Sequence, residues 1–329
     1  MESNPLVSIV SIYYNRTFKL VESIQSVLNQ TYSNFEFIII DDCSTDGQTY
    51  EMLLKFANYP GVHVYQNERN LGFVTTIRKA FDLAKGDFVA IHGSGDISDE
   101  NRIVQQVNAF LALPPDTAVV SSLCHYQNRR TGEMYVRSTD TGYVTLTTIL
   151  TDSPIIHGSA MIRRDYYQQV GGYRPFFKYR QDRDLWSRIS LLGKLYIIDK
   201  PLYTLTVQDA GVSSTLKSMF TGIFYSLLVD DLIKQRVKNG RDSIDIFGDD
   251  AKFLLNTQKS SDRIYRMLID SLLKNKLEQG RQIVAFCTEF DLRLGMPIKL
   301  RLLMRVFESS TVYKSVQIII GGLRGIRGK

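Results

Sequence analysis

Short apolar runs and amphipathic segments alternate along the first half of the chain. Apolar runs bounded by polar or glycine residues predict strands at 7–13, 35–41, 62–66, 87–92 and 117–124. Apolar residues at helical spacing predict the intervening helices at 17–29 (with Thr17 as its cap), 48–58, 73–84 and 99–113. This alternation is typical of βαβ units, so we expect an α/β fold with a mostly parallel sheet flanked by helices.

The pattern is less regular further along and then changes character. We expect a short strand at 158–163, followed by helices at 164–170 and 182–192 and a final strand or strand pair at 195–207. From about residue 215 the apolar residues follow helical spacing, with candidate breaks at 239–240, 280 and 297. The sequence therefore predicts two parts, a catalytic domain over 1–213 and a basic helical C-terminal region over 214–329.

The net charge of +6 is unevenly distributed. From residue 214 onward 20 Lys or Arg face 12 Asp or Glu, which gives +8 there and −2 for residues 1–213. Apolar and basic residues are interleaved at 298–307 and again at 318–327. Basic amphipathic helices can lie in a membrane interface, which predicts contact with a membrane surface through this region. The alternative is a helical appendage that packs on the catalytic domain and leaves a solvated basic face.

Cysteine usage and the N-terminus bear on the compartment. Three widely separated cysteines, Cys43, Cys124 and Cys287, favour a reduced compartment over a disulfide framework or a zinc site. The N-terminus lacks the pattern of a secretion signal, and no apolar run reaches the length of a membrane span. We therefore expect a cytoplasmic protein, peripheral on the inner face of the membrane if the basic region binds there.

Polar residues at the ends of two predicted strands suggest a ligand site. The strand at 35–41 is followed directly by Asp42, and the strand at 7–13 by Tyr14 and Asn15. Ligands of open α/β sheets bind at the carboxyl ends of the strands, where Asp42 can accept hydrogen bonds from a base N–H or a ribose hydroxyl. The alternative is that residues 42–46 form only a helix-capping turn.

A glycine-rich loop, His92-Gly93-Ser94-Gly95-Asp96, follows another predicted strand. Small residues around Ser94 let a phosphate or a sugar approach the backbone closely. The loop can equally be an ordinary strand-to-helix connection with His92 as a core histidine. The four histidines of the chain lack the spacing of metal ligands.

These motifs occur in an order that resembles the family-2 glycosyltransferases of GT-A fold. The set continues with 67–72 (NERNLG), 86–91 (GDFVAI), 171–173 (GGY) and 181–186 (QDRDLW), and it covers about residues 5–213. The resemblance implies transfer of a sugar from a nucleotide-diphosphate sugar to an acceptor hydroxyl, with inversion at the anomeric carbon. The basic amphipathic region suits an enzyme whose acceptor is linked to a lipid, so we expect a glycan or lipid-linked acceptor.

The resemblance assigns roles to individual residues. Asp42 matches the aspartate that contacts the nucleobase, and Tyr14 an aromatic position beside that base. Asn70 and Gly72 match the loop that flanks the nucleotide. Asp182 matches the catalytic base, which takes the proton of the attacking hydroxyl.

The sequence departs from the family next to Asp182, and Asp182 has an alternative interpretation. The family's glutamate before the base is Gln181 here, which changes the surroundings of the base without removing it. In the alternative interpretation, Asp182 caps a helix that begins near Arg183, and Arg183, Asp184 and Arg188 are surface charges.

The glycine-rich loop departs from the family pattern. The family usually holds a divalent cation, Mg²⁺ or Mn²⁺, with an Asp-x-Asp pair, but Gly93 and Gly95 occupy those positions and Asp96 is the sole candidate metal ligand there. One carboxylate is a poor site for either cation. Arg, Lys or backbone N–H groups can instead balance the charge of the leaving group.

The sequence bears on three function classes. An inverting glycosyltransferase fits the ordered motifs, whereas a catalytically silent nucleotide-sugar-binding subunit or sensor would account for the lost acidic pair. A dinucleotide-dependent oxidoreductase is disfavoured because Tyr13-Tyr14-Asn15 stands where a Gly-x-Gly-x-x-Gly loop would be needed. No motif that reads nucleic acid accompanies the basic region, so no nucleic-acid partner is expected.

Overall fold

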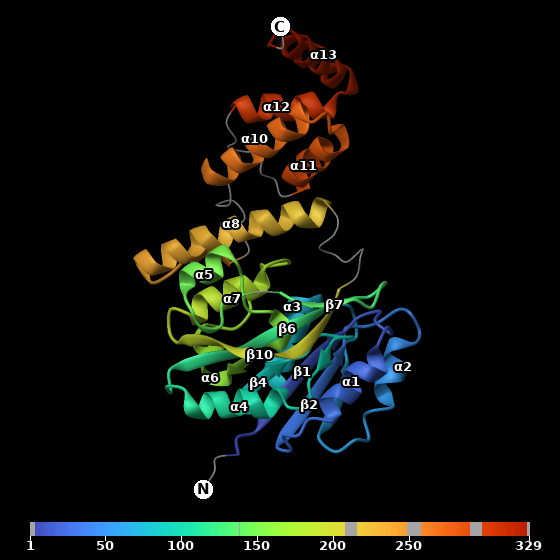
Figure 1. Cartoon of the computed structure of the whole chain (residues 1–329), viewed down its shortest axis with the longest axis vertical. Helices are drawn as coiled ribbons and strands as arrows, with labels where there is room; N and C mark the ends of the chain where they lie inside the picture. Colours follow the sequence, from blue (N-terminus) through green and yellow to red (C-terminus); the bar gives the residue numbers. More distant parts are fainter. Residues whose placement is uncertain (1–3, 138, 208–215, 249–257, 290–297, 328–329) are drawn as a thin grey trace. The chain divides into compact units, whose positions relative to one another are not determined.

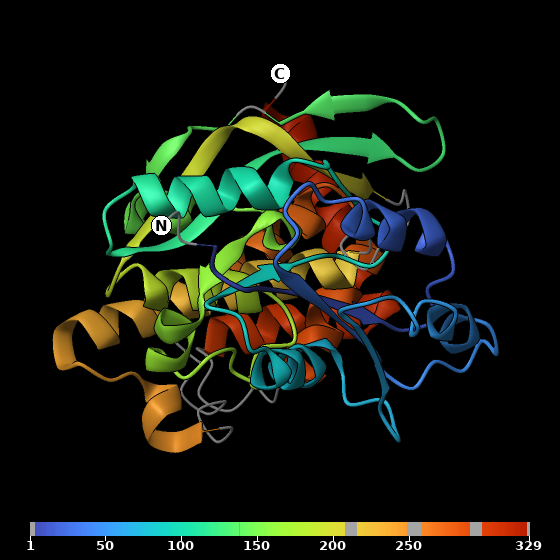
Figure 2. The ribbon, with the colours of Figure 1, turned by 90° about the horizontal axis from the view of Figure 1, so that it is seen from below.

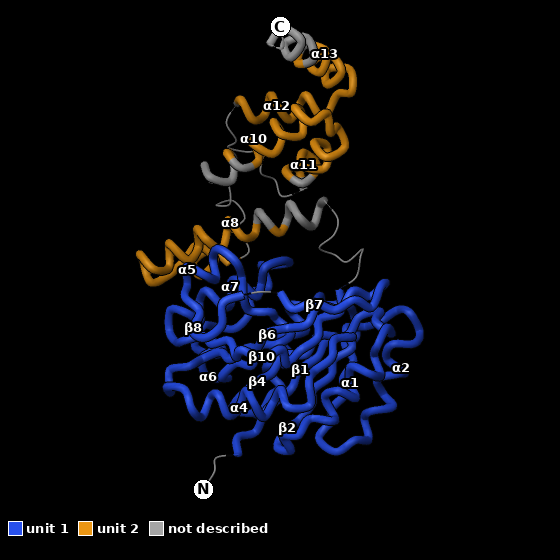
Figure 3. Tube along the Cα trace, viewed as in Figure 1, with its two compact units in different colours: residues 1–209 blue, residues 210–329 orange. Residues whose placement is uncertain are grey.

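The computed structural model describes residues 4–137, 139–207, 216–248, 258–289 and 298–327 (Figure 1). The chain divides into two compact units, residues 1–209 and residues 210–329 (Figure 3). The domain boundary expected at 213/214 lies outside the described residues.

The N-terminal unit is built on a ten-stranded sheet whose main path is β3-β2-β1-β4-β9-β6-β10-β5. Its first part is parallel: β1 (Val7–Tyr13) pairs with β2 (Phe35–Asp41) and β4 (Phe88–Ile91), and β2 pairs with β3 (Val62–Gln66). Tyr13 is in register with Asp41, so the loops after β1 and β2 leave the same edge of the sheet.

Beyond β4 the sheet is mixed. The short β9 (Met161–Arg163) runs antiparallel to both β4 and β6 (Thr117–Asn128), and β10 (Lys194–Val207) runs parallel to β6. Three short strands complete the sheet by antiparallel pairing: β5 (Ile97–Ser98) and β8 (Gly142–Val144) on β10, and β7 (Met134–Val136) on β6. The expected parallel sheet is therefore found in the first four strands, and the later strands add antiparallel pairs.

Helices cover both faces of the sheet. One face carries α1 (Leu20–Leu28), α2 (Thr49–Leu54) and α4 (Arg102–Ala112). The other carries α3 (Phe73–Leu83), α5 (Leu146–Thr151), α6 (Arg164–Gln169) and α7 (Gln181–Ile189). Figure 2 shows α1 and α4 on one side of the sheet and α3 on the other.

The central strands are apolar on both faces because both faces are covered. Ile9 and Ile39 join the cluster that includes α1 and α4, whereas Val10 and Ile40 join the cluster that includes α3 and α7. This double burial explains the unbroken apolar run that ends at Asp41. It also leaves only the strand ends and their loops available for polar chemistry.

The predicted strands at 7–13, 35–41 and 62–66 are confirmed, with the same bounds. The predicted cap at Thr17 is wrong, because α1 begins at Leu20 and has no side-chain cap; Thr17 contributes its carbonyl, which accepts from the Leu20 N–H at 3.1 Å. The final segment is one 14-residue strand, β10, with irregularities in its pairing with β6.

The C-terminal unit is helical in the parts that the structure describes, as expected. Its helices are α8 (Leu216–Asn239), α9 (Ser243–Phe247), α10 (Gln258–Leu273), α11 (Leu277–Glu289), α12 (Ile298–Glu308) and α13 (Ser310–Arg327). The break expected at 239–240 is found where α8 ends. The break expected at Gly280 is wrong: Gly280 lies inside α11, where a Cβ would overlap the ring of Phe307. The break expected at 297 lies outside the described residues.

The apolar side of α12 packs within the helical unit. Leu300, Leu303 and Phe307 are buried, whereas Lys299 and Arg301 are exposed. The apolar side of α12 is therefore covered, and its basic residues are solvated. None of the helices within the described ranges combines the length and the apolar character that crossing a bilayer demands.

Candidate functional site

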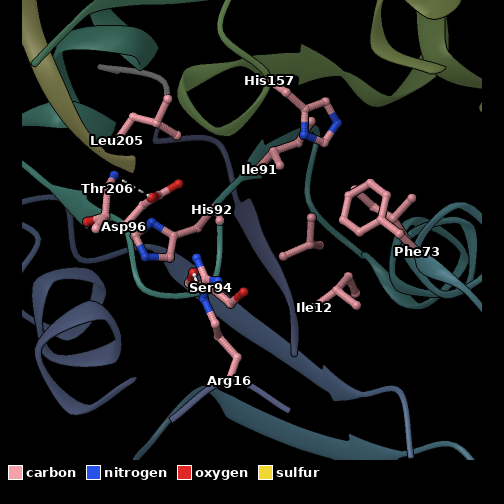
Figure 4. Close-up of a pocket in the computed structure, with 13 residues that line it drawn as sticks. Ile12, Arg16, Phe73, Ile91, His92, Ser94, Asp96, His157, Leu205 and Thr206 are labelled. Atoms are coloured by element: carbon pink, nitrogen blue, oxygen red, sulfur yellow. Dashed lines mark hydrogen bonds between the residues drawn. The ribbon is translucent and has the colours of Figure 1, made fainter. Parts of the chain in front are cut away.

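A cavity of about 230 Å³ opens at the carboxyl ends of β1 and β4 (Figure 4). The described residues that line it come from five parts of the N-terminal unit: Val10 and Ile12 of β1 with Arg16 after it; Phe73 and Ile77 of α3; Ile91, His92, Gly93, Ser94 and Asp96; His157; and Leu205 and Thr206 of β10. Its walls are apolar near α3 and polar near the glycine-rich loop. Such a mixture of apolar surface and a few convergent polar groups is typical of a ligand site.

His92 is a core histidine, as the alternative interpretation of the loop predicted. Its side chain is 1% exposed, with Nε2 at 2.9 Å from Ser23 Oγ and Nδ1 at 3.1 Å from Ser98 Oγ. Burial, aided by the charge of Arg102, lowers the pKa of His92 to about 3, so the ring is neutral at physiological pH. This histidine supports the loop and is not available to transfer protons.

Asp96 is bound on both of its carboxylate oxygens by the protein itself. Oδ2 accepts from the hydroxyl of Tyr203 at 2.8 Å, and Oδ1 accepts from the backbone N–H of Thr206 at 2.9 Å. Burial raises the pKa of Asp96, and these two hydrogen bonds oppose that shift. Asp96 therefore ties the glycine-rich loop to β10.

The loop does not offer the donor set of a Mg²⁺ or Mn²⁺ site. A Cβ at Gly93 would overlap Asp96 Oδ2, and Gly95 has a φ of +83°, a backbone conformation that an aspartate rarely adopts. Within the described residues no group of three or more His, Cys, Asp or Glu side chains is placed to hold a metal ion. The residues present do not fit a carboxylate-bound divalent cation.

Asp42 lies at the centre of a buried hydrogen-bond network. Its Oδ1 accepts from Asn67 Nδ2 at 2.8 Å, the Leu71 N–H at 2.9 Å and Thr76 Oγ1 at 2.8 Å, and its Oδ2 accepts from the Gly72 N–H at 2.9 Å. The residue is 2% exposed. Asp42 thus fixes the loop between β3 and α3, and the hydrogen bond of a nucleobase would have to be made to Oδ2, which accepts one bond here.

Asn70 and Gly72 belong to this loop, whereas Tyr14 follows β1. Asn70 is exposed, and its Oδ1 accepts from the Gly72 N–H at 3.2 Å. Gly72, with a φ of +81°, turns the chain into α3 and places Phe73 on the cavity wall. Tyr14 is 46% exposed at the end of β1, so its ring is accessible for stacking.

Asn15 links the loops after β1 and β2. Its Oδ1 accepts from the N–H groups of Thr45 at 2.8 Å and Asp46 at 3.2 Å, while its own N–H donates to Ser44 Oγ at 2.9 Å. Asp46 in turn caps the start of α2, because its Oδ1 accepts from the Thr49 N–H at 2.9 Å. The capping-turn alternative therefore applies to Asp46 but not to Asp42.

Asp182 lies in the first turn of α7, which begins at Gln181. Its Oδ1 accepts from the adjacent Arg183 N–H at 2.8 Å, and α7 has no side-chain cap. The alternative in which Asp182 caps a helix that starts near Arg183 is wrong. So is the assignment of Arg183, Asp184 and Arg188 as surface charges, since these residues are 7%, 2% and 2% exposed.

Buried ionic contacts hold α7 in place. Arg188 donates to Asp184 Oδ2 from Nε at 3.0 Å and from Nη2 at 2.7 Å. Arg188 also donates to the carbonyls of Val170 at 2.6 Å and Gly172 at 2.8 Å. The helix that carries Asp182 is thereby fixed to the Gly171–Gly172 turn.

His157 lines the cavity and interacts electrostatically with Asp182. Its Nε2 lies 2.7 Å from the hydroxyl of Tyr173, and its ring meets Phe73 edge-on at a centroid distance of 5.6 Å. Burial lowers the pKa of His157, and the negative charge of the nearby Asp182 opposes that shift. Burial raises the pKa of Tyr173 well above its ordinary value, and the charge of Asp182 adds to this effect. Burial thus disfavours the charged forms of both His157 and Tyr173.

The structure brings some of the predicted site residues together directly and others through a neighbour. Ser94 and Asp96 line the cavity. Asp42, Tyr14, Asn70, Gly72 and Asp182 are not among its lining residues, although Gly72 precedes Phe73 and Asp182 acts on His157. Arg16 and Phe73 line the cavity but were missed by sequence reasoning. Each directly follows a predicted motif, and that adjacency was the available signal.

Comparison with known proteins identifies the family. The family model described as glycosyl transferase family 2 matches residues 8–171. EpsE of Bacillus subtilis, named as a glycosyltransferase, is 32% identical over 219 residues, which cover 62% of this chain and 73% of EpsE. WcaA of Escherichia coli, named for colanic acid biosynthesis, is 34% identical over 112 residues, or 34% of this chain and 39% of WcaA.

Solved structures agree on the fold. The crystal structure of S. aureus TarS residues 1–349 in complex with UDP-GlcNAc superimposes with a TM-score of 0.60 at 20% identity, over 97% of this chain and 91% of that one. The sheet order, the helices on both faces and the C-terminal helices all accord with the GT-A fold that the motifs implied. The chain therefore belongs to glycosyl transferase family 2 and is a glycosyltransferase.

Proposed function

We propose that the protein is an inverting glycosyltransferase that moves a sugar from a nucleotide-diphosphate sugar to a hydroxyl of a glycan or lipid-linked acceptor. The acceptor oxygen attacks the anomeric carbon as the bond between that carbon and the diphosphate oxygen breaks. The bonding electron pair leaves with the diphosphate, and the proton of the attacking hydroxyl passes to the Asp182 carboxylate. Attack opposite to the leaving group inverts the anomeric centre.

The electrostatic interaction of Asp182 with His157, a residue of the cavity wall, supports this proposal most. The carboxylate is half-buried in the first turn of α7. His157, which feels the charge of Asp182, lines the cavity together with Ser94. A sugar in the cavity would thus lie between the glycine-rich loop, which would receive the diphosphate, and the base.

The nucleoside would extend from the cavity toward the loops after β1 and β3. At about 230 Å³ the cavity is smaller than the roughly 300–1,000 Å³ typical of complete ligand sites, so it would take the sugar and part of the diphosphate. Tyr14 offers an exposed ring for stacking, and Asp42 Oδ2 an acceptor for a base N–H. Uracil and thymine present the same imide edge to that acceptor, and TarS was crystallised with UDP-GlcNAc.

The names of the relatives favour a polysaccharide acceptor. WcaA is named for colanic acid biosynthesis, and TuaG of Bacillus subtilis, 28% identical over 203 residues, for teichuronic acid biosynthesis. Both names refer to extended bacterial glycans. A growing glycan, free or linked to a lipid, is therefore the acceptor class that we propose.

Product stereochemistry tests the proposed reaction. We expect transfer from a UDP- or dTDP-linked α-sugar to give a β-linked product, because the acceptor attacks opposite the leaving group. The anomeric proton coupling in the NMR spectrum of the purified product measures this. A product that retains the donor's configuration would contradict the inverting mechanism.

The same assay addresses the second candidate, a catalytically silent nucleotide-sugar-binding subunit. The loss of the acidic pair at Gly93 and Gly95 favours this candidate. It predicts donor binding without transfer or donor hydrolysis, with or without Mn²⁺ and over a panel of donors and acceptors. Turnover with any donor rules it out.

We also propose that the helical unit contacts an anionic membrane surface. Arg301 and Arg305 are exposed on α12, beside Leu302, which is 54% exposed. On α13, Lys314 is exposed and Ile318 is 76% exposed. Basic residues contribute about 1 kcal/mol each near an anionic surface, and exposed apolar side chains can insert at the interface.

A charge-reversal experiment tests membrane contact. The double variant Arg301→Glu/Arg305→Glu should lose most of its sedimentation with vesicles that contain phosphatidylserine. The matched control is Lys274→Glu/Lys276→Glu, which reverses two exposed charges of the same unit outside α12. Equal binding by both variants and the unchanged protein would contradict the proposal.

A further inference from the structure

We infer that Arg16, rather than a carboxylate-held metal ion, neutralises the diphosphate of the donor. This inference rests on the proposed function and identifies the cationic group of that same site. It follows from two independent features, the donor set of the glycine-rich loop and the place that the Arg16 side chain occupies.

The glycine-rich loop has no room for the acidic pair that it lacks. Asp96, its one carboxylate, is bound by Tyr203 and by the Thr206 N–H. A Cβ at Gly95 would lie 2.9 Å from the carbonyl oxygen of Phe18, in addition to the positive φ. Restoring an aspartate at either glycine would therefore displace the loop. The local structure thus requires glycine at both positions.

Arg16 occupies the space next to that gap. A Cβ at Gly95 would lie 3.5 Å from Arg16 Nε, and Nε itself donates to the Ser94 carbonyl at 3.3 Å. The backbone N–H of Arg16 donates to Thr49 Oγ1 at 2.9 Å, which fixes the start of the side chain. A positive charge is thus held where the family places its second metal-binding carboxylate.

Arg16 faces the same cavity as the rest of the proposed site. It is the only lysine or arginine among the described residues that line the cavity. Figure 4 shows its side chain extending from the loop after β1 to Ser94, with Asp96 and Thr206 on one side and His157 beyond. The guanidinium therefore lies on the wall formed by the loop that would receive the diphosphate.

A guanidinium supplies what this step needs. It remains protonated, presents donors in a planar fork that matches phosphate oxygens, and binds them through charge-assisted hydrogen bonds. As the anomeric bond breaks, negative charge grows on the leaving oxygen, and a fixed cation beside it stabilises that charge. No proton leaves Arg16, and no co-reactant is required.

Ligand binding with and without chelator tests this inference in the full-length protein. The probes are UDP and dTDP, with uridine as the matched probe that lacks the diphosphate. The unchanged protein should bind UDP or dTDP equally well in EDTA and in Mn²⁺. Arg16→Gln should weaken diphosphate binding by about tenfold to a hundredfold, the range for loss of a charge-assisted hydrogen bond, and leave uridine binding unchanged. Retained uridine binding also shows that the variant is folded.

Arg129→Gln is the matched control. Arg129 is exposed, and its guanidinium carbon lies 3.8 Å from the ring centroid of Phe18. Arg129→Gln therefore removes one positive charge, as Arg16→Gln does, without changing the cavity wall. The inference is overturned if Mn²⁺ is needed for diphosphate binding, if neither diphosphate binds, or if Arg16→Gln and Arg129→Gln behave alike. Diphosphate binding that depends on Arg16 but is never accompanied by transfer would count against the proposed function alone.

Discussion

Asp182→Asn is expected to lower the rate of sugar transfer by about 10²–10⁴-fold, the usual contribution of a positioned general base. Asparagine has nearly the same shape, and its side-chain oxygen can still accept from the Arg183 N–H. What it lacks is the ability to take the proton of the attacking hydroxyl. The loss should therefore appear in kcat, whereas the affinity for the nucleotide should be unchanged.

The measurement is steady-state transfer together with calorimetric titration of the nucleotide. The chain offers a matched control in Asp165, whose Oδ1 accepts from the following Tyr166 N–H at 2.8 Å in the first turn of α6. Asp165→Asn changes the same local contact at an exposed position outside the cavity. Near-normal turnover of Asp182→Asn, or equal losses in the two variants, would refute the assignment of the base.

Arg188→Met is expected to destabilise the N-terminal unit by about 3–5 kcal/mol, the usual cost of leaving a buried charge without its partner. The substitution removes both donors of Arg188 to Asp184 and leaves the Val170 and Gly172 carbonyls without theirs. Arg174, whose Nε lies 3.6 Å from Asp184 Oδ2, would remain beside the carboxylate. This cost is a large part of the total stability of a typical domain.

Chemical denaturation followed by Trp186 fluorescence measures this change, since Trp186 lies on the same helix. Asp184→Leu/Arg188→Met should recover part of the loss, because the buried Asp184 carboxylate is then removed together with Arg188. Lys194→Met is the comparison for an exposed pair: Lys194 Nζ and Asp116 Oδ2 are 2.9 Å apart, with both side chains about half exposed. The denaturation midpoint of Lys194→Met should equal that of the unchanged protein. Equal destabilisation of the single and double variants would show that the ion pair is not the cause.

The first three strands could be predicted to the residue because their signal is local. Strands buried on both faces read as continuous apolar runs, and polar residues or glycine bound them. The start of α1 was misjudged because Lys19 is in the left-handed conformation and Thr17 offers its backbone, not its side chain. The break predicted at Gly280 is wrong because this glycine makes room for Phe307, which belongs to another helix. Contacts between distant segments leave no local pattern.

The candidate site divides in the same way. The motifs located the strand ends, and with them Ser94 and Asp96. They could not show that the partners of Asp42 come from residues 67–76, or that Asp96 is bound by residues of β10. Arg16 was missed because a single arginine after a strand usually belongs to the solvated surface. Only the folded backbone places it beside Gly95.

The network around Asp42 constrains how donor preference could be re-engineered. The Asp42 carboxylate accepts hydrogen bonds from Asn67, Leu71, Gly72 and Thr76. A substitution of Asp42 that admits a different base would therefore also remove the hydrogen bonds that fix the loop between β3 and α3. Tyr14 is largely exposed just after β1, and its substitution leaves those four hydrogen bonds in place. Variant libraries for new donor specificity should therefore begin at Tyr14 and keep Asp42 unchanged.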